Sequence, residues 1–270
     1  MEFWRKLLEI LDADMTTPQP YGWFHLLFFV LSIAAGILLC IKFKNPTEKQ
    51  VRILVLTVSI ISIVLEIYKQ INYTFSPTET GINVDFQWYA FPWQFCSIPM
   101  YVGLLAGLTK GKFHQWLCAF LGTFSIFAGI CVMIYPVQVF ISTIGINIQT
   151  MICHGSMLTL GIFLLGTQYV RAEHKTILKA IPVFAVAVAT AMLLNELAHF
   201  TGFTGGETFN MFFISPYEDP SLPVYSIVQQ YVPYPFCLII YIAAFSLASY
   251  LVLLLAMGIK AAVRKIKTKA

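Results

Sequence analysis

Residues 51–73 read VRILVLTVSIISIVLEIYKQINY, an apolar run that carries one carboxylate and one ammonium group in its second half. A helix needs about 20 such residues to cross roughly 30 Å of hydrocarbon, and it satisfies its own backbone hydrogen bonds there. Six further stretches have the same character. The full set of predicted spans is 21–43, 51–73, 91–108, 113–135, 150–170, 177–200 and 235–259. The sequence therefore predicts an all-α, polytopic membrane protein with a seven-transmembrane-helix bundle over residues 21–259.

The composition excludes an ordinary soluble protein. Hydrophobic residues occupy 58% of the 270 positions and charged residues 11%, which is more apolar surface than one soluble core can bury. The six cysteines have no metal-binding spacing, and the chain has no glycine-rich phosphate loop. We therefore expect no metal site and no cofactor, and we expect the protein to act in or beside the bilayer.

Basic residues are concentrated on one side of the predicted bundle. Fourteen of the 17 Lys and Arg residues lie in or beside the linkers that follow the first, third and fifth spans, or in the C-terminal segment. The opposite loops, residues 74–90, 136–149 and 201–234, contain none. Because Lys and Arg near span ends stay in the cytoplasm, the pattern predicts an outside N-terminus, a cytoplasmic C-terminus and a multi-pass protein of the cell (cytoplasmic) membrane.

The two ends of the chain lie outside the predicted bundle. Residues 1–20 combine acidic residues with an amphipathic apolar pattern, which predicts a short interfacial helix and not a cleaved signal peptide. Residues 260–270 are predicted to form a basic cytoplasmic tail. Five basic charges beside a span are typical of an anchor for anionic lipid, so we expect no nucleic-acid partner.

Seven ionisable side chains inside the predicted spans share one depth. Counting 1.5 Å per residue from each outer span end places all of them within roughly 2 to 11 Å of the outer surface. They are His25, Glu66, Lys69, Cys96, His154, Glu196 and His199. Since such groups are costly inside a membrane, this predicts one polar cavity that opens toward the outer leaflet. Its walls are expected from the first, second, third, fifth and sixth spans.

Helical spacing offers a structural alternative for some of these groups. Glu66 and Lys69 are spaced i, i+3, and so are Glu196 and His199, so each pair would neutralise itself on one helical face. Asn195 is i, i+4 from His199 and would extend that polar face. The sequence leaves open whether the pairs only tolerate burial or take part in a reaction.

Cys96 and His154 have the side chains and the matching depth that a nucleophile and its base require. Pro92 suits the first turn of the third span, which would place the Cys96 thiol near a helix N-terminus, where the dipole favours negative charge. Pro99 would leave the Phe95 carbonyl without its helical donor, beside the thiol. These features favour a reactive thiol at Cys96.

Other interpretations of the same residues stay open. Cys96 would serve equally as a small packing residue, or it would form a disulfide with Cys153 across two spans. His154 would in that case only hydrogen-bond a neighbour. Gly155 would let another helix or a lipid chain approach closely.

Short motifs in the chain resemble those of a known group of membrane proteins. Trp-Gln-Phe-Cys-Ser-Ile-Pro at 93–99 and Cys-His-Gly-Ser at 153–156 are similar to segments of the YwaF-like integral membrane proteins, whose animal relative is transmembrane protein 164. The resemblance extends over nearly the whole chain. It includes Asn-Glu at 195–196, Asn-Met-Phe-Phe at 210–213 and Pro-Tyr-Pro at 233–235.

The resemblance implies an acyltransferase that moves fatty acyl groups between membrane phospholipids and lysophospholipids. Cys96 would take the acyl chain as a thioester, and His154 would act as its base. Supporting residues of the pocket would be His25, Glu66, Lys69, Asn195, Glu196, His199 and Asn210. More distant relatives, the androgen-induced lipid hydrolases, use a threonine with a histidine, which makes a lipid hydrolase the neighbouring alternative.

Classes without acyl chemistry also fit a polytopic chain. A transporter places charges around a cavity but normally needs access from both faces, whereas the ionisable groups here reach one face. A receptor is indicated by helix number alone, which does not determine function. A retinal protein is excluded, because no lysine lies between residues 235 and 258. A purely structural protein stays open, and so does the oligomeric state.

Overall fold

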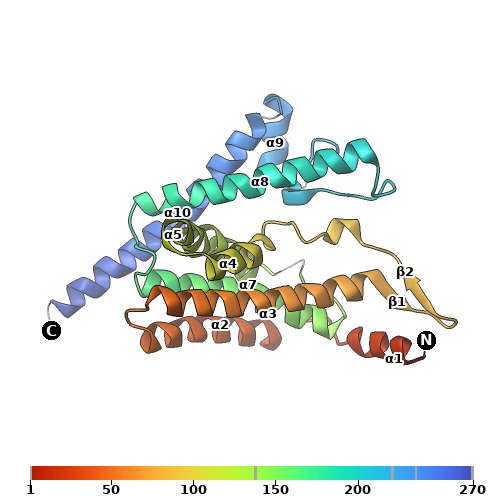
Figure 1. Cartoon of the computed structure of the whole chain (residues 1–270), viewed down its shortest axis with the longest axis horizontal. Coiled ribbons are helices and arrows are strands. Elements are labelled where there is room, and N and C mark those ends of the chain that lie inside the picture. Colours follow the sequence, from red (N-terminus) through yellow and green to blue (C-terminus); the bar gives the residue numbers. More distant parts are fainter. Residues whose placement is uncertain (1, 137–138, 220–221, 235, 269–270) are drawn as a thin grey trace.

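The computed structural model describes residues 2–136, 139–219, 222–234 and 236–268 and shows a helical, multi-pass membrane protein (Figure 1). Within these ranges, six helical segments are long and apolar enough to cross a membrane. They are α2 (Trp23–Lys42), α3 (Glu48–Thr74), the stack of α5 (Gly111–Phe120), η2 (Leu121–Ser125) and α6 (Ile126–Ile134), α7 (Ile144–Gly166), α8 (Lys175–Thr201) and α10 (Phe236–Lys267). The all-α, polytopic prediction is therefore confirmed.

The third predicted span, 91–108, is helical only in its second half. There, α4 covers Ile98–Leu108, and its 11 residues extend about 16 Å at 1.5 Å each. The short turn η1 (Trp88–Ala90) and an irregular segment precede it. The prediction that Pro92 lies in the first helical turn is wrong. Pro99 occupies that turn, where a missing N–H costs nothing because the turn has no helical acceptor. The described chain thus has six full-length helices and one short apolar helix.

Small residues allow close packing around α7, which contacts α2, α3 and α6. A Cβ atom at Gly155 of α7 would overlap Ser32 of α2, and a Cβ atom at Gly103 of α4 would overlap Ser59 of α3. Gly155 therefore admits a neighbouring helix, which is one of the two roles predicted for it. The close approach of α4 to α3 brings the segment before α4 against the polar part of α3.

A π-helical turn interrupts the stack over residues 111–134. All five residues of this turn, η2, are buried, and Phe124 stacks on Phe184 of α8 with ring centroids 4.5 Å apart. A π-turn is rare in helices and is frequent at functional sites. The last residue of the turn, Ser125, faces the cavity that holds the candidate active site.

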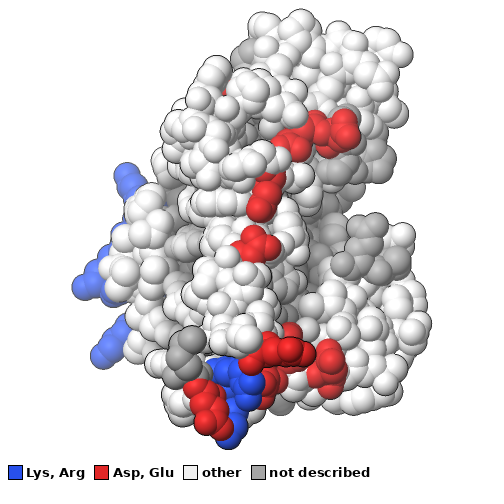
Figure 2. Space-filling view, turned by 90° about the vertical axis from the view of Figure 1, so that its right-hand side faces the viewer, with Lys and Arg blue, Asp and Glu red and all other residues white. Residues whose placement is uncertain are grey.

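The two termini lie at opposite ends of the bundle (Figure 1). The N-terminal end holds α1 (Glu2–Leu11) and a hairpin of β1 (Phe75–Pro77) and β2 (Ile82–Val84). The predicted N-terminal helix is thus present, and the Tyr68 hydroxyl of α3 anchors its end by donating to the Leu11 carbonyl at 2.7 Å. Asp and Glu side chains gather over this face of the molecule (Figure 2).

Two elements of the C-terminal third differ from the sequence-based expectation. Helix α9 (Pro223–Tyr231) lies within the loop predicted over residues 201–234. Helix α10 continues to Lys267, so most of the predicted basic tail is helical. Pro235, the predicted first residue of the last span, and Lys269 of the tail lie outside the described residues.

Candidate active site

A cavity of about 250 Å³ lies between α3, the segment before α4, η2 and α7. It brings together four of the predicted site residues, namely Glu66, Lys69, Cys96 and His154. The second, third and fifth predicted spans contribute walls, as expected. The walls expected from the first and sixth spans are instead replaced by η2 of the fourth span and by the loop that precedes α7.

The cavity has charged residues toward one end and none toward the other. Lys69 and Tyr73 line one end, whereas Val58 and Leu160 line the other. Val58 and Tyr73 are both on α3 and are separated by about 22 Å at 1.5 Å per residue. This arrangement suits a ligand with a charged part and an uncharged part.

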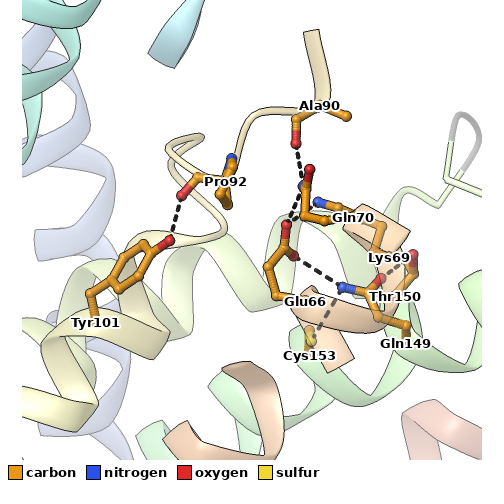
Figure 3. A network of polar contacts seen from close by, with 9 residues as sticks. All are labelled: Glu66, Lys69, Gln70, Ala90, Pro92, Tyr101, Gln149, Thr150 and Cys153. Carbon is orange, nitrogen blue, oxygen red and sulfur yellow. Dashed lines mark hydrogen bonds and ion pairs between the residues drawn. The ribbon is translucent and has the colours of Figure 1, made fainter. Parts of the chain in front are cut away.

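Glu66 is the centre of the charged end (Figure 3). Its Oε1 atom lies 2.7 Å from the Lys69 ammonium and accepts a hydrogen bond from Gln70 Nε2 at 2.8 Å. Its Oε2 atom accepts from Gln149 Nε2 at 3.4 Å. The prediction that Glu66 and Lys69 neutralise each other is confirmed. Glu66 is only 7% exposed, and the ion pair and both amide donors stabilise its charge.

Two of the hydrogen bonds that hold η1 and the irregular segment with Cys96 are drawn in Figure 3. Gln70 Nε2 also donates to the Ala90 carbonyl at 2.9 Å, and the Tyr101 hydroxyl donates to the Pro92 carbonyl at 3.0 Å. These bonds tie the segment to α3 on one side and to α4 on the other. The Cys96 thiol therefore has a defined position beside the cavity.

Cys96 lies two residues before the first residue of α4, so its thiol is near a helix N-terminus, as predicted. Phe95 also precedes the helix, and its carbonyl is therefore not the helical acceptor that Pro99 was expected to leave free. Cys96 and Cys153 both line the cavity and both are free, so the alternative disulfide between them is not formed. Cys96 therefore contributes a free thiol to the cavity wall.

His154 is 9% exposed, and one of its ring nitrogens contacts the backbone of its own helix. Its Nδ1 atom lies 2.8 Å from the carbonyl oxygen of Thr150. A carbonyl only accepts, so Nδ1 carries the proton and Nε2 carries the lone pair. No hydrogen-bond partner for Nε2 occurs among the residues that the structure describes. The imidazole is thus fixed in the tautomer that a general base requires.

Residues 18–255, which include every residue of this cavity, match the TMEM164 family. The chain belongs to the TMEM164 family. The resemblance inferred from the short motifs is thereby confirmed. No curated protein and no solved structure matches the chain.

Five residues predicted for the pocket lie elsewhere in this TMEM164-family protein, and His25 is the first. His25 is buried on α2, its Nδ1 atom accepts from the Tyr21 backbone N–H at 3.1 Å, and its Nε2 atom lies 2.9 Å from the Met133 carbonyl. Both ring nitrogens are therefore occupied. His25 joins α2 to α6 and does not line the cavity.

Asn195 and Asn210 stabilise a buried turn and do not line the cavity of Cys96. Asn195 Oδ1 accepts from the Met211 N–H at 2.8 Å, and its Nδ2 donates to the Met211 carbonyl at 3.1 Å. Gln94 makes the same kind of two-point contact, donating to the Asn210 carbonyl at 3.0 Å and accepting from the Phe212 N–H at 2.9 Å. The Asn210 side chain accepts from the Ser215 N–H at 2.9 Å. These amides fix a turn in which Phe212 has the left-handed φ of 59°.

Glu196 and His199 do not pair directly but meet at Tyr217. The Tyr217 hydroxyl donates to Glu196 Oε2 at 2.7 Å, and the His199 ring stacks on the Tyr217 ring with centroids 3.5 Å apart. The hydrogen bond to the carboxylate raises the pKa of Tyr217, which lies in the loop after α8. His199 and Tyr217 line a separate pocket of about 180 Å³, so neither belongs to the cavity of Cys96.

Several polar residues that line the cavity were not predicted, and Gln149 and Ser125 are two of them. Gln149 completes the hydrogen bonds of Glu66, and Ser125 lies on the π-turn with a fully buried side chain. The Ser125 Oγ atom has no hydrogen-bond partner within the described part of the chain. A buried hydroxyl without a partner is unusual in proteins, and this one belongs to a residue that lines the cavity. Neutral residues in apolar stretches carry no charge signal, which is why the sequence did not reveal them.

The structure offers no metal centre among its described residues, because no group of three His, Cys, Asp or Glu side chains lies close enough together.

Proposed function

We propose that this TMEM164-family protein is a membrane lipid acyltransferase that moves a fatty acyl group between glycerophospholipids through a thioester on Cys96. The observation that carries the proposal is one cavity with a free thiol, a histidine whose Nε2 lone pair is unused, a charged end and an uncharged end. Phospholipids and lysophospholipids are amphipathic and match this combination.

The first half-reaction would form the acyl-enzyme. His154 Nε2 takes the Cys96 proton, and the thiolate attacks the ester carbonyl of the donor phospholipid. The tetrahedral intermediate then releases the glycerol oxygen as the leaving group. That oxygen takes the proton from His154, so the products are a lysophospholipid and an acylated Cys96.

The second half-reaction would reverse these roles with a new acceptor. His154 removes the proton from a lysophospholipid hydroxyl, and the resulting oxygen attacks the Cys96 thioester. Collapse of this intermediate returns the thiolate, which takes the proton back from His154. The apolar side chains that line the cavity exclude water and therefore favour transfer to a lipid over hydrolysis.

Ser125 would stabilise the negative oxygen of both intermediates. Its hydroxyl is buried in the cavity wall and has no hydrogen-bond partner in the described structure. A donor held in position before the reaction stabilises charge that develops in the transition state, and no reorganisation is then required. At the other end, the Glu66 and Lys69 pair would meet the charged head group.

The distribution of charged residues between the two ends of the bundle supports an orientation of the protein in the membrane. Acidic side chains gather at the end that holds α1 and the hairpin (Figure 2), whereas the linker between α2 and α3 and the C-terminus lie at the other end (Figure 1). We propose that α4 and its irregular preceding segment together complete a seventh crossing. The N-terminus and an interfacial α1 then lie outside, and the end of α10 lies in the cytoplasm of a cell membrane.

Intact-protein mass spectrometry tests the proposal. The purified protein is given a phospholipid donor without any acceptor, so that the acyl-enzyme accumulates. We expect a hydroxylamine-sensitive acyl adduct on the native protein and on the control Cys153→Ala, and none on Cys96→Ala. An adduct that persists in Cys96→Ala refutes the role of this thiol.

A lysophospholipid acceptor is then added to the acylated protein. Formation of a new phospholipid identifies an acyltransferase, whereas release of free fatty acid identifies a hydrolase that uses the same two residues. Absence of any adduct on the native protein would direct attention to the transporter and receptor alternatives.

A further inference from the structure

A second cavity, separate from the candidate active site, opens along the surface of the bundle. This groove of about 480 Å³ lies between α6, α7 and α10 and has an almost wholly apolar lining. Leu255 and Ile259 of its lining are 63% and 57% exposed on the outside of α10. All three elements belong to segments apolar enough to cross a membrane, so the groove faces hydrocarbon. An apolar chain, and not water, fills such a groove.

Two polar side chains line the groove, Gln168 in the turn after α7 and Lys260 in the C-terminal part of α10. Lys260 lines the groove, and it has no carboxylate partner within the described chain. Gln168 lines it as well, and its Nε2 atom donates to the Leu165 carbonyl at 2.6 Å. The Gln168 Oε1 atom is buried without a hydrogen-bond partner in the described structure. The groove therefore has a free cation and a free acceptor beside its apolar part.

The backbone at Gln168 strengthens this observation. Gln168 has φ of 59°, a left-handed conformation that costs energy for any residue with a Cβ atom. Strained positions of this kind cluster at ligand sites, where the surrounding structure maintains them. Gln168 thus lines the groove, has a strained backbone and carries an unpaired, buried carbonyl oxygen.

We propose that this groove binds one anionic glycerophospholipid. An acyl chain lies along the apolar residues of α6, α7 and α10, and the phosphate contacts the Lys260 ammonium. A head-group hydroxyl donates to Gln168 Oε1, which favours a head group with free hydroxyls, such as glycerol. Arg264, one helical turn beyond Lys260 on α10, adds a second positive charge near the same level.

The groove does not depend on the proposed acyl transfer. Leu158 of α7 lines the groove, whereas its neighbours Met157 and Leu160 line the cavity of Cys96. Likewise Ile126 faces the groove and Ser125 faces the cavity. The wall formed by α6 and α7 therefore separates a lipid that stays bound from a lipid that reacts.

Native mass spectrometry of the full-length protein in detergent tests the inference. The probe is phosphatidylglycerol, compared with phosphatidylcholine of the same acyl chains. We expect one phosphatidylglycerol to remain bound at concentrations at which phosphatidylcholine is lost. Lys260→Gln should weaken this binding about fivefold, because a basic residue near an anionic lipid surface contributes about that factor. Gln168→Leu should lower the preference for phosphatidylglycerol over phosphatidic acid.

A matched control removes a positive charge that does not line the groove. Lys112→Gln makes the same change in net charge and lies in the α5 segment, so it should retain the bound lipid. Thermal unfolding in the same detergent verifies that each variant is folded. Three results would overturn the inference. The first is an equal loss of bound phosphatidylglycerol in Lys112→Gln and Lys260→Gln. The others are equal retention of phosphatidylcholine by the native protein and dimerisation that displaces the lipid.

Discussion

The Nδ1 atom of His154 lies 2.8 Å from the carbonyl oxygen of Thr150, one turn earlier on α7. This single contact assigns the proton of the ring, because the carbonyl cannot donate. It leaves Nε2 as the only basic atom of the side chain. The helix that buries the histidine therefore also prepares it for proton transfer.

Replacement of His154 by Asn should retain the contact and abolish the chemistry. The Asn amide still donates to the Thr150 carbonyl, but it has no basic atom, so formation of the acyl adduct should fall by about 10²–10⁴-fold. The rate of adduct formation in the mass-spectrometric assay measures this. His25→Asn is the control, because His25 lies outside the cavity and should affect stability only. Similar losses in both variants would contradict the role of His154.

Ser125→Ala should separate catalysis from stability. Removal of an oxyanion donor lowers a chemical step by about 10²–10³-fold. The hydroxyl has no partner in the described structure, so its removal should leave the unfolding temperature unchanged or slightly higher. Ser62→Ala is the matched control in the same cavity, since the Ser62 hydroxyl already donates to the Val58 carbonyl at 3.0 Å. Unchanged acylation in Ser125→Ala would exclude the oxyanion role.

The sequence correctly predicted residues whose burial carries a high free-energy cost. Charges inside apolar stretches are expensive, so Glu66 and Lys69 could be predicted as a pair, and the structure places them 2.7 Å apart. The length of the apolar stretches likewise predicted the membrane-spanning helices, because apolar surface is costly in water. The length of the apolar stretch gave a wrong start for α4. Residues 91–97 are apolar enough for a span, but the helix begins only at Ile98, with Pro99 in its first turn.

The predicted depth of an ionisable residue in the membrane does not determine which site its side chain joins. His25, Asn195 and Glu196 have depths similar to those of the cavity residues, yet each faces a different partner. The direction of a side chain depends on helix rotation and crossing angle, which one sequence does not reveal. Ser125 also depends on a π-turn, whose extra residue has no recognisable sequence pattern.

Lys69→Met should be more harmful than the double change Lys69→Met with Glu66→Gln. The single change leaves a nearly buried carboxylate without its cation, and it should lower the free energy of unfolding by on the order of 3 kcal/mol. The double change removes both charges and keeps the amide of Gln70 bonded to a neutral acceptor. Thermal unfolding of the four proteins in a double-mutant cycle measures the coupling. Additive losses would show that the Glu66 charge is stabilised without Lys69.

Asn195→Leu should destabilise the turn over residues 210–212 without a direct effect on the reaction. The change removes both bonds to Met211, which is fully buried, and each unpaired backbone group costs about 1–3 kcal/mol. Gln94→Leu removes the equivalent pair on the same turn, so the two changes should combine less than additively. Unfolding temperatures and limited proteolysis of the 202–219 loop measure this. If Asn195→Leu instead abolishes acyl-adduct formation in a fully stable protein, Asn195 supports the reaction, as the resemblance implied.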